Sequence, residues 1–325
     1  DTTSLSFTSA DVGVPTLSSS SPAFGATGIT VDSNIILNFS EAVDVESGNI
    51  TIKKTSDNST VESIAVDSSQ VSGSGTNQIT INPTSNFDSS TAYYVQIDAT
   101  ALDDSSGNSY AGISDTTSLS FTTADVVAPS LSSSSPADNA TAVAVDSNLG
   151  LNFSEAVEVK TGNISIKKTS DNSTVETIDV TSSQVAGSGT TQITINPTSN
   201  FDSSTAYYVQ IDATALDDSS GNSYAGISDT TSLSFTTADV VAPSLSSSSP
   251  ADNATAVAVD SNLGLNFSEA VEVKTGNISI KKTSDNSTVE TIDVTSSQVA
   301  GSGTTQITIN PTSNFDSSTA YYVQI

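Results

Sequence analysis

The sequence predicts an all-β protein, a tandem array of immunoglobulin-like β-sandwich domains in an elongated rod. Three observations predict this class. The segment DTTSLSFT begins at Asp1, Asp115 and Asp229, so the chain repeats every 114 residues. Within each repeat, apolar residues alternate with polar ones over short runs, which is typical of half-buried strands. The runs are separated by segments rich in Gly, Ser, Asn, Asp and Pro, which favour turns.

The repeat divides the chain into one end segment and three units. We expect residues 1–11 to be the last strand of a preceding repeat, residues 12–125 and 126–239 to be immunoglobulin-like repeats, and residues 240–325 to be a repeat without its final strand. Residues 115–211 and 229–325 are identical. Because the chain begins and stops partway through a repeat, we expect it to be an internal stretch of a longer array.

The second repeat shows the expected strands most clearly. Its alternating apolar positions are Leu149, Leu151 and Phe153; Ile164 and Ile166; Ile178 and Val180; Ile193 and Ile195; and Tyr207, Val209 and Ile211. The segments SSPADNA, KTSDNST, AGSGT, NPTSNFDSS and DDSSGNS supply turns between strands. No run has helical spacing. About seven short strands per repeat indicate an immunoglobulin-like sandwich.

The end of the repeat carries two further features. Tyr207 begins a penultimate strand, where sandwich folds often use a tyrosine hydroxyl to hold a corner to the backbone; the alternative is that it only fills the core. The closing strand SLSFTTAD buries Leu119 and Phe121 and continues directly into VVAPSL. Because this linker is short and contains Pro129, we expect little free swivelling between units.

Composition excludes several classes of function. The chain has 36 acidic residues against 8 basic ones and a net charge of −28, which disfavours binding to nucleic acid or to an anionic membrane surface. It contains no Cys and no His, so disulfides, thiolate chemistry and Ser-His-Asp catalysis are excluded in these residues. No apolar run is long enough to cross a membrane. An acidic, cysteine-free chain rich in Ser and Thr is typical of an extracellular or cell-surface protein.

Four motifs in a fixed order resemble a known family. They are APSLSSSSPADNATAVAVDSN, LNFSEAV, LDDSSGNSYAG and LSFTTAD, and they recur in every repeat with some substitutions in the first and a truncated end in the third. In this order the chain resembles the bacterial immunoglobulin-like domain first described in S-layer proteins and common in giant adhesins. The resemblance covers essentially the whole chain. It implies a spacer or scaffold, often in a calcium-rich setting, and names no ligand.

Carboxylates at the junctions between repeats are candidate metal ligands. In such a sandwich the loop before the last strand lies at the pole where the chain enters, so we expect the linker residue Asp125 to approach two loops of the next unit. Oxygen ligands suit a hard cation such as Ca²⁺, which takes about six to eight of them. The candidates are Asp125, Glu155, Asp217, Asp218 and Asn222; one repeat earlier, Asp11, Glu41, Asp103, Asp104 and Asn108; and one repeat later, Asp239 and Glu269, where the loop is cut off.

An ordinary polar loop is the alternative to a metal site. Asp and Asn cap turns and Gly supplies a left-handed position, and DDSSGNS lacks the ligand spacing of an EF-hand. Charge favours calcium, because about ten net negative charges per repeat would push units apart unless screened or bridged. A bridging cation would stiffen the rod.

Other candidate chemistries are weaker. Lys53 and Lys54, repeated at Lys167 and Lys168, could form an isopeptide bond with a nearby Asn, but a solvated strand end that discourages edge pairing explains them more simply. The paired carboxylates could serve glycoside hydrolysis, yet they lie in Gly- and Ser-rich loops with little aromatic surface to stack a sugar. We therefore expect no enzyme activity.

Two non-enzymatic functions remain. The first is a stalk or extender of a large bacterial surface protein or adhesin, whose partners are the neighbouring repeats of the same chain. The second is an assembly subunit, in which copies pack into an S-layer sheet or an extracellular filament. The Ser- and Thr-rich surface favours the stalk, because assembly through edges or apolar patches needs such surfaces exposed.

Overall fold

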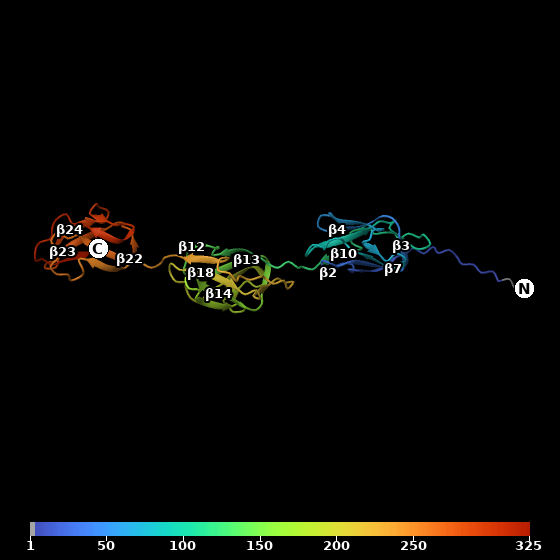
Figure 1. Ribbon diagram of the computed structural model, residues 1–325, viewed down its shortest axis with the longest axis horizontal. Helices are drawn as coiled ribbons and strands as arrows, with labels where there is room; N and C mark the ends of the chain where they lie inside the picture. The colour runs from blue at the N-terminus through green and yellow to red at the C-terminus, as the bar shows by residue number, and fades with distance from the viewer. Residues whose placement is uncertain (1–3) are drawn as a thin grey trace. The chain divides into compact units, whose positions relative to one another are not determined.

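A computed structural model describes residues 4–325, and its regular elements are all strands (Figure 1). The described residues form two compact units, the first ending at Ala238 and the second spanning Asp239–Ile325. The first unit contains two sandwiches, one for each of the first two repeats, and the second contains one. No helix in the described part of the chain is long and apolar enough to span a membrane. The prediction of an all-β array of sandwiches is confirmed.

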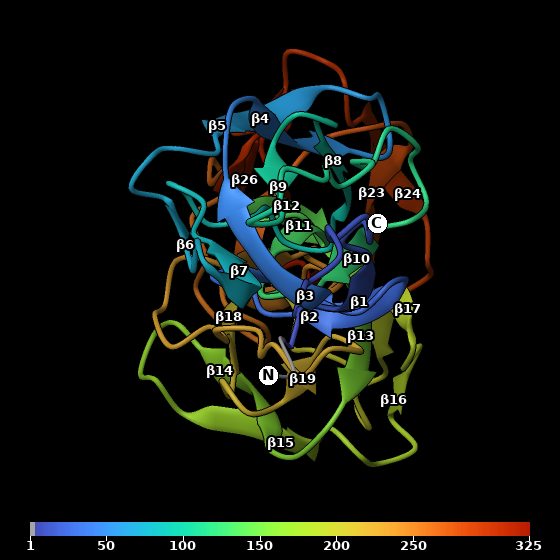
Figure 2. The same cartoon turned by 90° about the vertical axis from the view of Figure 1, so that its right-hand side faces the viewer.

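The first sandwich packs two five-stranded sheets face to face. One has the order β1-β3-β7-β6, with β9 also paired to β3, and the other has the order β2-β10-β8-β4-β5. Figure 2 shows β4 and β5 in one layer, with β7, β3 and β1 in the other. The strands are β1 (Leu17–Ser21), β2 (Ala26–Ile29), β3 (Ile35–Val45), β4 (Asn49–Lys54), β5 (Thr60–Ala65), β6 (Val71–Ser72), β7 (Thr76–Ile81), β8 (Ala92–Ile97), β9 (Leu102–Asp103) and β10 (Ser120–Thr123).

The second sandwich repeats this topology, with sheets β11-β13-β17-β16, β19 pairing with β13, and β12-β20-β18-β14-β15. Its strands are β11 (Leu131–Ser135), β12 (Ala140–Val143), β13 (Leu149–Val159), β14 (Asn163–Lys168), β15 (Thr174–Asp179), β16 (Val185–Ala186), β17 (Thr190–Ile195), β18 (Ala206–Ile211), β19 (Leu216–Asp217) and β20 (Ser234–Thr237). The corresponding strands pair in the same register as in the first sandwich, because nearly every inward-facing residue is the same.

The third sandwich, in the second unit, has a four-stranded sheet β21-β22-β26-β25 and a three-stranded sheet β24-β23-β27. Its strands are β21 (Leu245–Ser249), β22 (Leu263–Val271), β23 (Asn277–Lys282), β24 (Thr288–Asp293), β25 (Val299–Ala300), β26 (Thr304–Ile309) and β27 (Tyr321–Gln324). Among its described residues there is no counterpart of β12 or of β20. In the second sandwich β12 pairs only with β20. Where the described residues include no counterpart of β20, a counterpart of β12 therefore has no strand to pair with.

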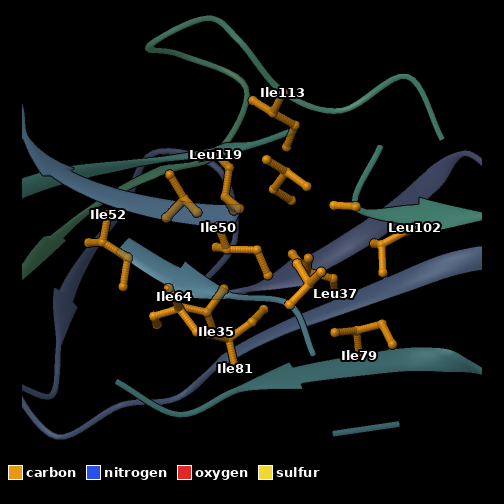
Figure 3. Packing of buried hydrophobic residues seen from close by; sticks show 14 of the residues in the cluster. Ile35, Leu37, Ile50, Ile52, Ile64, Ile79, Ile81, Leu102, Ile113 and Leu119 are labelled. Atoms are coloured by element: carbon orange, nitrogen blue, oxygen red, sulfur yellow. The ribbon is translucent and has the colours of Figure 1, made fainter. Parts of the chain in front are cut away.

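The core of each sandwich lies between its two sheets. In β3, Ile35, Leu37 and Phe39 are buried while the residues between them are half-buried, as the period of two predicts. Figure 3 shows Ile35 and Leu37 meeting Ile50 and Ile52 of the opposite sheet. The same positions form a separate core in the second sandwich.

A tyrosine fastens one corner of every sandwich. The Tyr207 hydroxyl accepts a hydrogen bond from the backbone N–H of Asp202 at 2.8 Å, and Tyr93 makes the same bond with Asp88 at 2.8 Å. Tyr207 is 1% exposed and its ring stacks on Phe235 of the closing strand. The predicted tyrosine corner is therefore confirmed, and the residue fills the core as well.

Candidate metal site at the domain entrance

The loop after β19 holds one carboxylate in a fixed position. Asp218 accepts hydrogen bonds from the backbone N–H groups of Ser220 at 2.8 Å and Asn222 at 2.7 Å, and from the Asn222 side-chain amide at 2.7 Å. Gly221 has φ of +90°, a conformation that glycine adopts without strain. Burial alone would raise the pKa of Asp218, but the hydrogen bonds from Asn222, Ser220 and Gly221 outweigh it and lower the pKa. Asp218 is therefore an ionised carboxylate that is only 2% exposed.

Asp125, where the first sandwich ends, joins the two sandwiches of the first unit. Its Oδ1 accepts hydrogen bonds from the Ser89 hydroxyl of the first sandwich at 2.9 Å and from the Val127 N–H at 3.1 Å. Its backbone carbonyl accepts one from the Asn222 amide of the second sandwich at 3.2 Å. Asp125 is thus held by groups on both sides of the junction, through its carboxylate on one side and its backbone carbonyl on the other.

Glu155 supplies the third carboxylate, from the long strand β13. The register of β13 against β17 shifts between Asn152 and Val157, so Glu155 lies in an irregular part of the strand. One carboxylate oxygen each from Asp125, Glu155 and Asp218 lie within 4.8 Å of one another. Burial, followed by repulsion from Asp125 and Asp218, raises the pKa of Glu155.

The first sandwich contains the same arrangement at its own entrance. Asp11, Glu41 and Asp104 each bring an oxygen within 4.8 Å of the others. The Asn108 amide donates to Asp104 at 2.7 Å and to the backbone carbonyl of Asp11 at 3.4 Å. Hydrogen bonds from Asn108 lower the pKa of Asp104. We call these two clusters of three carboxylates the acidic triads.

The remaining sequence candidates lie outside the two triads. Asp103 and Asp217 belong to β9 and β19, where they pair with Asp44 and Glu158 of the neighbouring strands. Neighbouring residues of an extended chain point to opposite sides, so the carboxylate that follows each of them joins the triad instead. In the second unit, burial and then repulsion from Asp239 raise the pKa of Glu269, which shows that these two acids are close neighbours.

The triads fit a calcium ion by their donor chemistry. All three donors are carboxylates, and one in each triad is held ionised by its own loop. Oxygens bound to the same Ca²⁺ at about 2.4 Å can be at most about 4.8 Å apart, which the triads satisfy. A bound cation would neutralise the negative charges of Asp125 in the linker and of the carboxylates in the two loops of the next sandwich.

The lysines at the end of β4 and its counterparts form ion pairs. Lys54 lies 2.6 Å from Asp88 and Lys168 lies 2.6 Å from Asp202. In the first pair the Asp88 side chain is 62% exposed, so the pair is solvated and contributes little to stability. This arrangement supports a solvated strand end over a buried isopeptide site.

The geometry of both sandwiches agrees with the comparison of the whole chain with known families. The family described as bacterial Ig-like domain matches residues 11–123, 125–237 and 239–325. The chain therefore belongs to the bacterial Ig-like domain family, in three tandem copies. Repeats of this family are typically non-catalytic structural domains. No curated protein sequence matches the chain.

Solved structures with a similar fold are distant in sequence. The S-layer protein rSbsC(31-844) is 12% identical, with 96% of this chain and 52% of that one covered and a TM-score of 0.24. The BSP domain of a biofilm associated protein is 15% identical, with 67% and 29% covered and a TM-score of 0.19. The ectodomain of mouse nectin-like molecule 4 is 10% identical, with 93% and 96% covered and a TM-score of 0.30. The chain spans about half or less of the S-layer and biofilm proteins.

Proposed function

We propose that this chain is a structural spacer of a bacterial cell-surface protein, and that calcium at the domain entrances stiffens it. Membership of the bacterial Ig-like family supports a structural role. The acidic composition, rich in Ser and Thr, is typical of extracellular proteins and supports that location. Identical units in tandem extend reach without adding a new function, because each contacts only its neighbours.

The observation that carries the proposal is that the same acidic triad is built twice from the same parts. In each case one carboxylate comes from the residue that enters the sandwich, and two come from loops of that sandwich. Three negative charges this close repel one another, and burial has already raised the pKa of Glu155. A divalent cation would turn this repulsion into a link between the linker and the domain that follows.

Calcium titration with small-angle scattering tests the proposal. In calcium the chain should melt at a higher temperature and show a larger maximum dimension than in chelator, with magnesium as the control cation. Glu41→Gln with Glu155→Gln should remove both effects. Equal melting temperatures and equal dimensions in calcium and in chelator would refute the stiffening role. The spacer role is tested separately, since electron micrographs of ordered sheets would favour an assembly subunit.

A further inference from the structure

The repeats carry asparagines in the acceptor motif for N-linked glycosylation, Asn-X-Ser/Thr with X other than Pro. Such triplets arise often by chance in a chain rich in Ser and Thr, so the motif alone selects none of them. The enzyme that transfers the sugar must reach the side-chain amide nitrogen and a backbone that is free of strand pairing. The structure can therefore sort the candidates. They are Asn38, Asn49 and Asn58; Asn139, Asn152, Asn163 and Asn172; and Asn253, Asn266, Asn277 and Asn286.

Two sets of these asparagines lie in strands that are paired on both sides. Asn38 belongs to β3, between β1 and β7, and its Nδ2 donates to the Ser19 hydroxyl at 3.1 Å. Asn152 and Asn266 donate to the corresponding serines at 3.0 Å. Asn49 and its counterparts begin β4, β14 and β23, each of which pairs with a strand on either side. While the sandwich is folded, these segments cannot enter the active site of another enzyme.

A third set has its amide nitrogen engaged. The Nδ2 of Asn139 donates to the Asp138 carboxylate at 2.7 Å, and that of Asn253 donates to Asp252 at 3.0 Å. The first repeat has Gly25 at this position, so the motif is not common to the three repeats. This set is therefore a poor acceptor.

The remaining asparagine of each repeat lies in an exposed hairpin. Asn58 belongs to the turn between β4 and β5, where residues 55–60 are all exposed, and residues 169–174 and 283–288 are exposed in the same way around Asn172 and Asn286. The Asn58 Oδ1 accepts a hydrogen bond from a tyrosine hydroxyl, which fixes the orientation of the amide. Its Nδ2 donates to no group in the part of the chain that the structure describes, so this nitrogen is available.

The three hairpins share one conformation. Asn58, Asn172 and Asn286 each have φ of +59°. Their Oδ1 atoms accept from Tyr94, Tyr208 and Tyr322 at 3.1, 3.2 and 3.4 Å. In each turn the preceding Asp accepts from the backbone N–H of the following Ser, at 2.9, 2.9 and 3.0 Å. An enzyme that can reach one of these asparagines can therefore reach all three.

We propose that Asn58, Asn172 and Asn286 are acceptors for an N-linked oligosaccharide, transferred by an oligosaccharyltransferase from a polyprenyl pyrophosphate carrier. Nδ2 forms a bond to the anomeric carbon of the sugar and loses one proton to a base of the transferase. The bond from that carbon to the pyrophosphate oxygen breaks, and the lipid pyrophosphate leaves with the electron pair. The threonine that completes each motif is exposed and offers its hydroxyl for recognition. This goes beyond the spacer role and does not depend on calcium.

A glycan at this position would protect an open sheet edge. β5 is the edge strand of its sheet and begins two residues after Asn58, and β15 and β24 are edge strands in the same place. Next to the turn, Val61 is 44% exposed, and Val175 and Val289 are 45% exposed. An open edge with an exposed apolar side chain can pair with the edge of another chain. A bulky, hydrated oligosaccharide beside it would exclude that neighbour.

Mass spectrometry of the chain isolated from the cells that make it tests the proposal. Peptide N-glycosidase converts each glycosylated asparagine to aspartate, which marks the site by its mass. The conversion should occur at residues 58, 172 and 286 and at no other asparagine of the motif. A native chain without glycan at these residues would overturn the proposal. Glycan at Asn38 or Asn49 as often as at Asn58 would also overturn it, because the folded hairpin would then not select the site.

Transfer to the folded chain in vitro supplies the second arm. The chain is produced in a host without N-glycosylation and incubated with a purified oligosaccharyltransferase and a lipid-linked oligosaccharide. The wild type should gain one glycan at each hairpin. A variant without the motif threonines should gain none, and a control that changes only the middle residue of each motif should gain all of them. The variant is Thr60→Ala with Thr174→Ala and Thr288→Ala, and the control is Ser59→Ala with Ser173→Ala and Ser287→Ala.

The altered side chains are exposed, so both variants should unfold at the same denaturant concentration as the wild type. A peptide with the sequence of residues 55–62 shows that the enzyme accepts this motif. A peptide that is glycosylated while the folded chain is not would overturn the proposal, because the hairpin would then be inaccessible. Transfer that persists in the variant without the motif threonines would overturn it as well.

Discussion

Replacing Glu155 with Gln should change stability in opposite directions with and without calcium. Each pair of unit charges 4.8 Å apart repels by about 1 kcal/mol in water and about 3.5 kcal/mol at an effective dielectric of 20. Glu155 takes part in two such pairs, with Asp125 and Asp218, and it is partly exposed, so we use the lower value. In chelator the variant should therefore be more stable by about 2 kcal/mol, or about 8 °C in Tm for a domain of this size.

In calcium the stability difference between Glu155→Gln and the wild type reverses sign. A cation present at about 100 times its Kd stabilises the wild-type fold by about 2.7 kcal/mol, and the variant loses most of this gain with its ligand. Calorimetry in chelator and in calcium measures both effects, and isothermal titration should show one site lost from the two triads. Asp146→Asn removes one exposed charge from the same sandwich and is the control. A Glu155→Gln chain that is less stable in chelator, or that keeps both calcium sites, would refute the argument.

The pH dependence of the same variant tests whether charge repulsion at Glu155 causes the change in stability. The pKa of Glu155 in the folded state lies above its ordinary value of 4.5, so the folded state binds this proton more tightly than the unfolded state does. Its favourable contribution is complete below pH 4.5 and is lost as the pH rises through the raised pKa. In chelator, the advantage of Glu155→Gln should therefore grow with pH across this window. An advantage that is constant with pH would point to a packing effect instead.

Three further substitutions test the fold. Phe153→Ala removes a buried ring whose centroid lies 5.2 Å from that of Tyr224. It should lower the stability of the second sandwich by about 3–5 kcal/mol and leave the calorimetric transitions of the other sandwiches nearly unchanged. A loss of stability shared by the whole chain would contradict independent domains. Tyr207→Phe leaves the Asp202 N–H without its acceptor and should cost about 1–3 kcal/mol by urea unfolding; no loss would mean that the corner bond is dispensable. Asp229→Ala removes the hydrogen bonds that Asp229 accepts from the Ser232 side chain and the neighbouring backbone, which lower its pKa. The resulting loss in the free energy of unfolding should be complete above pH 3.8 and should shrink below it. A loss that does not depend on pH would exclude this linkage.

The sequence predicted the strands that are half-buried, since their period of two is visible in a single run. It did not predict β12 (Ala140–Val143), which we assigned in part to a turn, because this short strand exists only through parallel pairing with β20, about 100 residues further on. The third sandwich confirms this dependence: the same residues form no strand where the described chain lacks the partner. Short strands defined by a distant partner leave no local pattern.

The candidate site shows the same division between local and distant information. The repeat and the topology of the sandwich were enough to place Asp125 near the loops that hold Glu155 and Asp218. The prediction could not separate Asp217 from Asp218, because the side of the chain on which each carboxylate lies depends on where β19 ends. It also missed the Ser89 hydroxyl, which holds Asp125 from the first sandwich. Only the identical spacing of SNFDSS and TTAD in each repeat could have suggested that contact.

The closing strand β10 and the first carboxylate of the next triad belong to one continuous segment. This couples the folding of one sandwich to the candidate metal site of the next. The Thr123 hydroxyl at the end of β10 donates a hydrogen bond to the backbone carbonyl of Asp88 within the first sandwich, and two residues later Asp125 belongs to the triad of the second. A cation held by Asp125 would resist withdrawal of β10, because the strand could leave only if its terminal carboxylate also left the site. Calcium should therefore slow the release of β10 from the first sandwich as well as stiffen the junction.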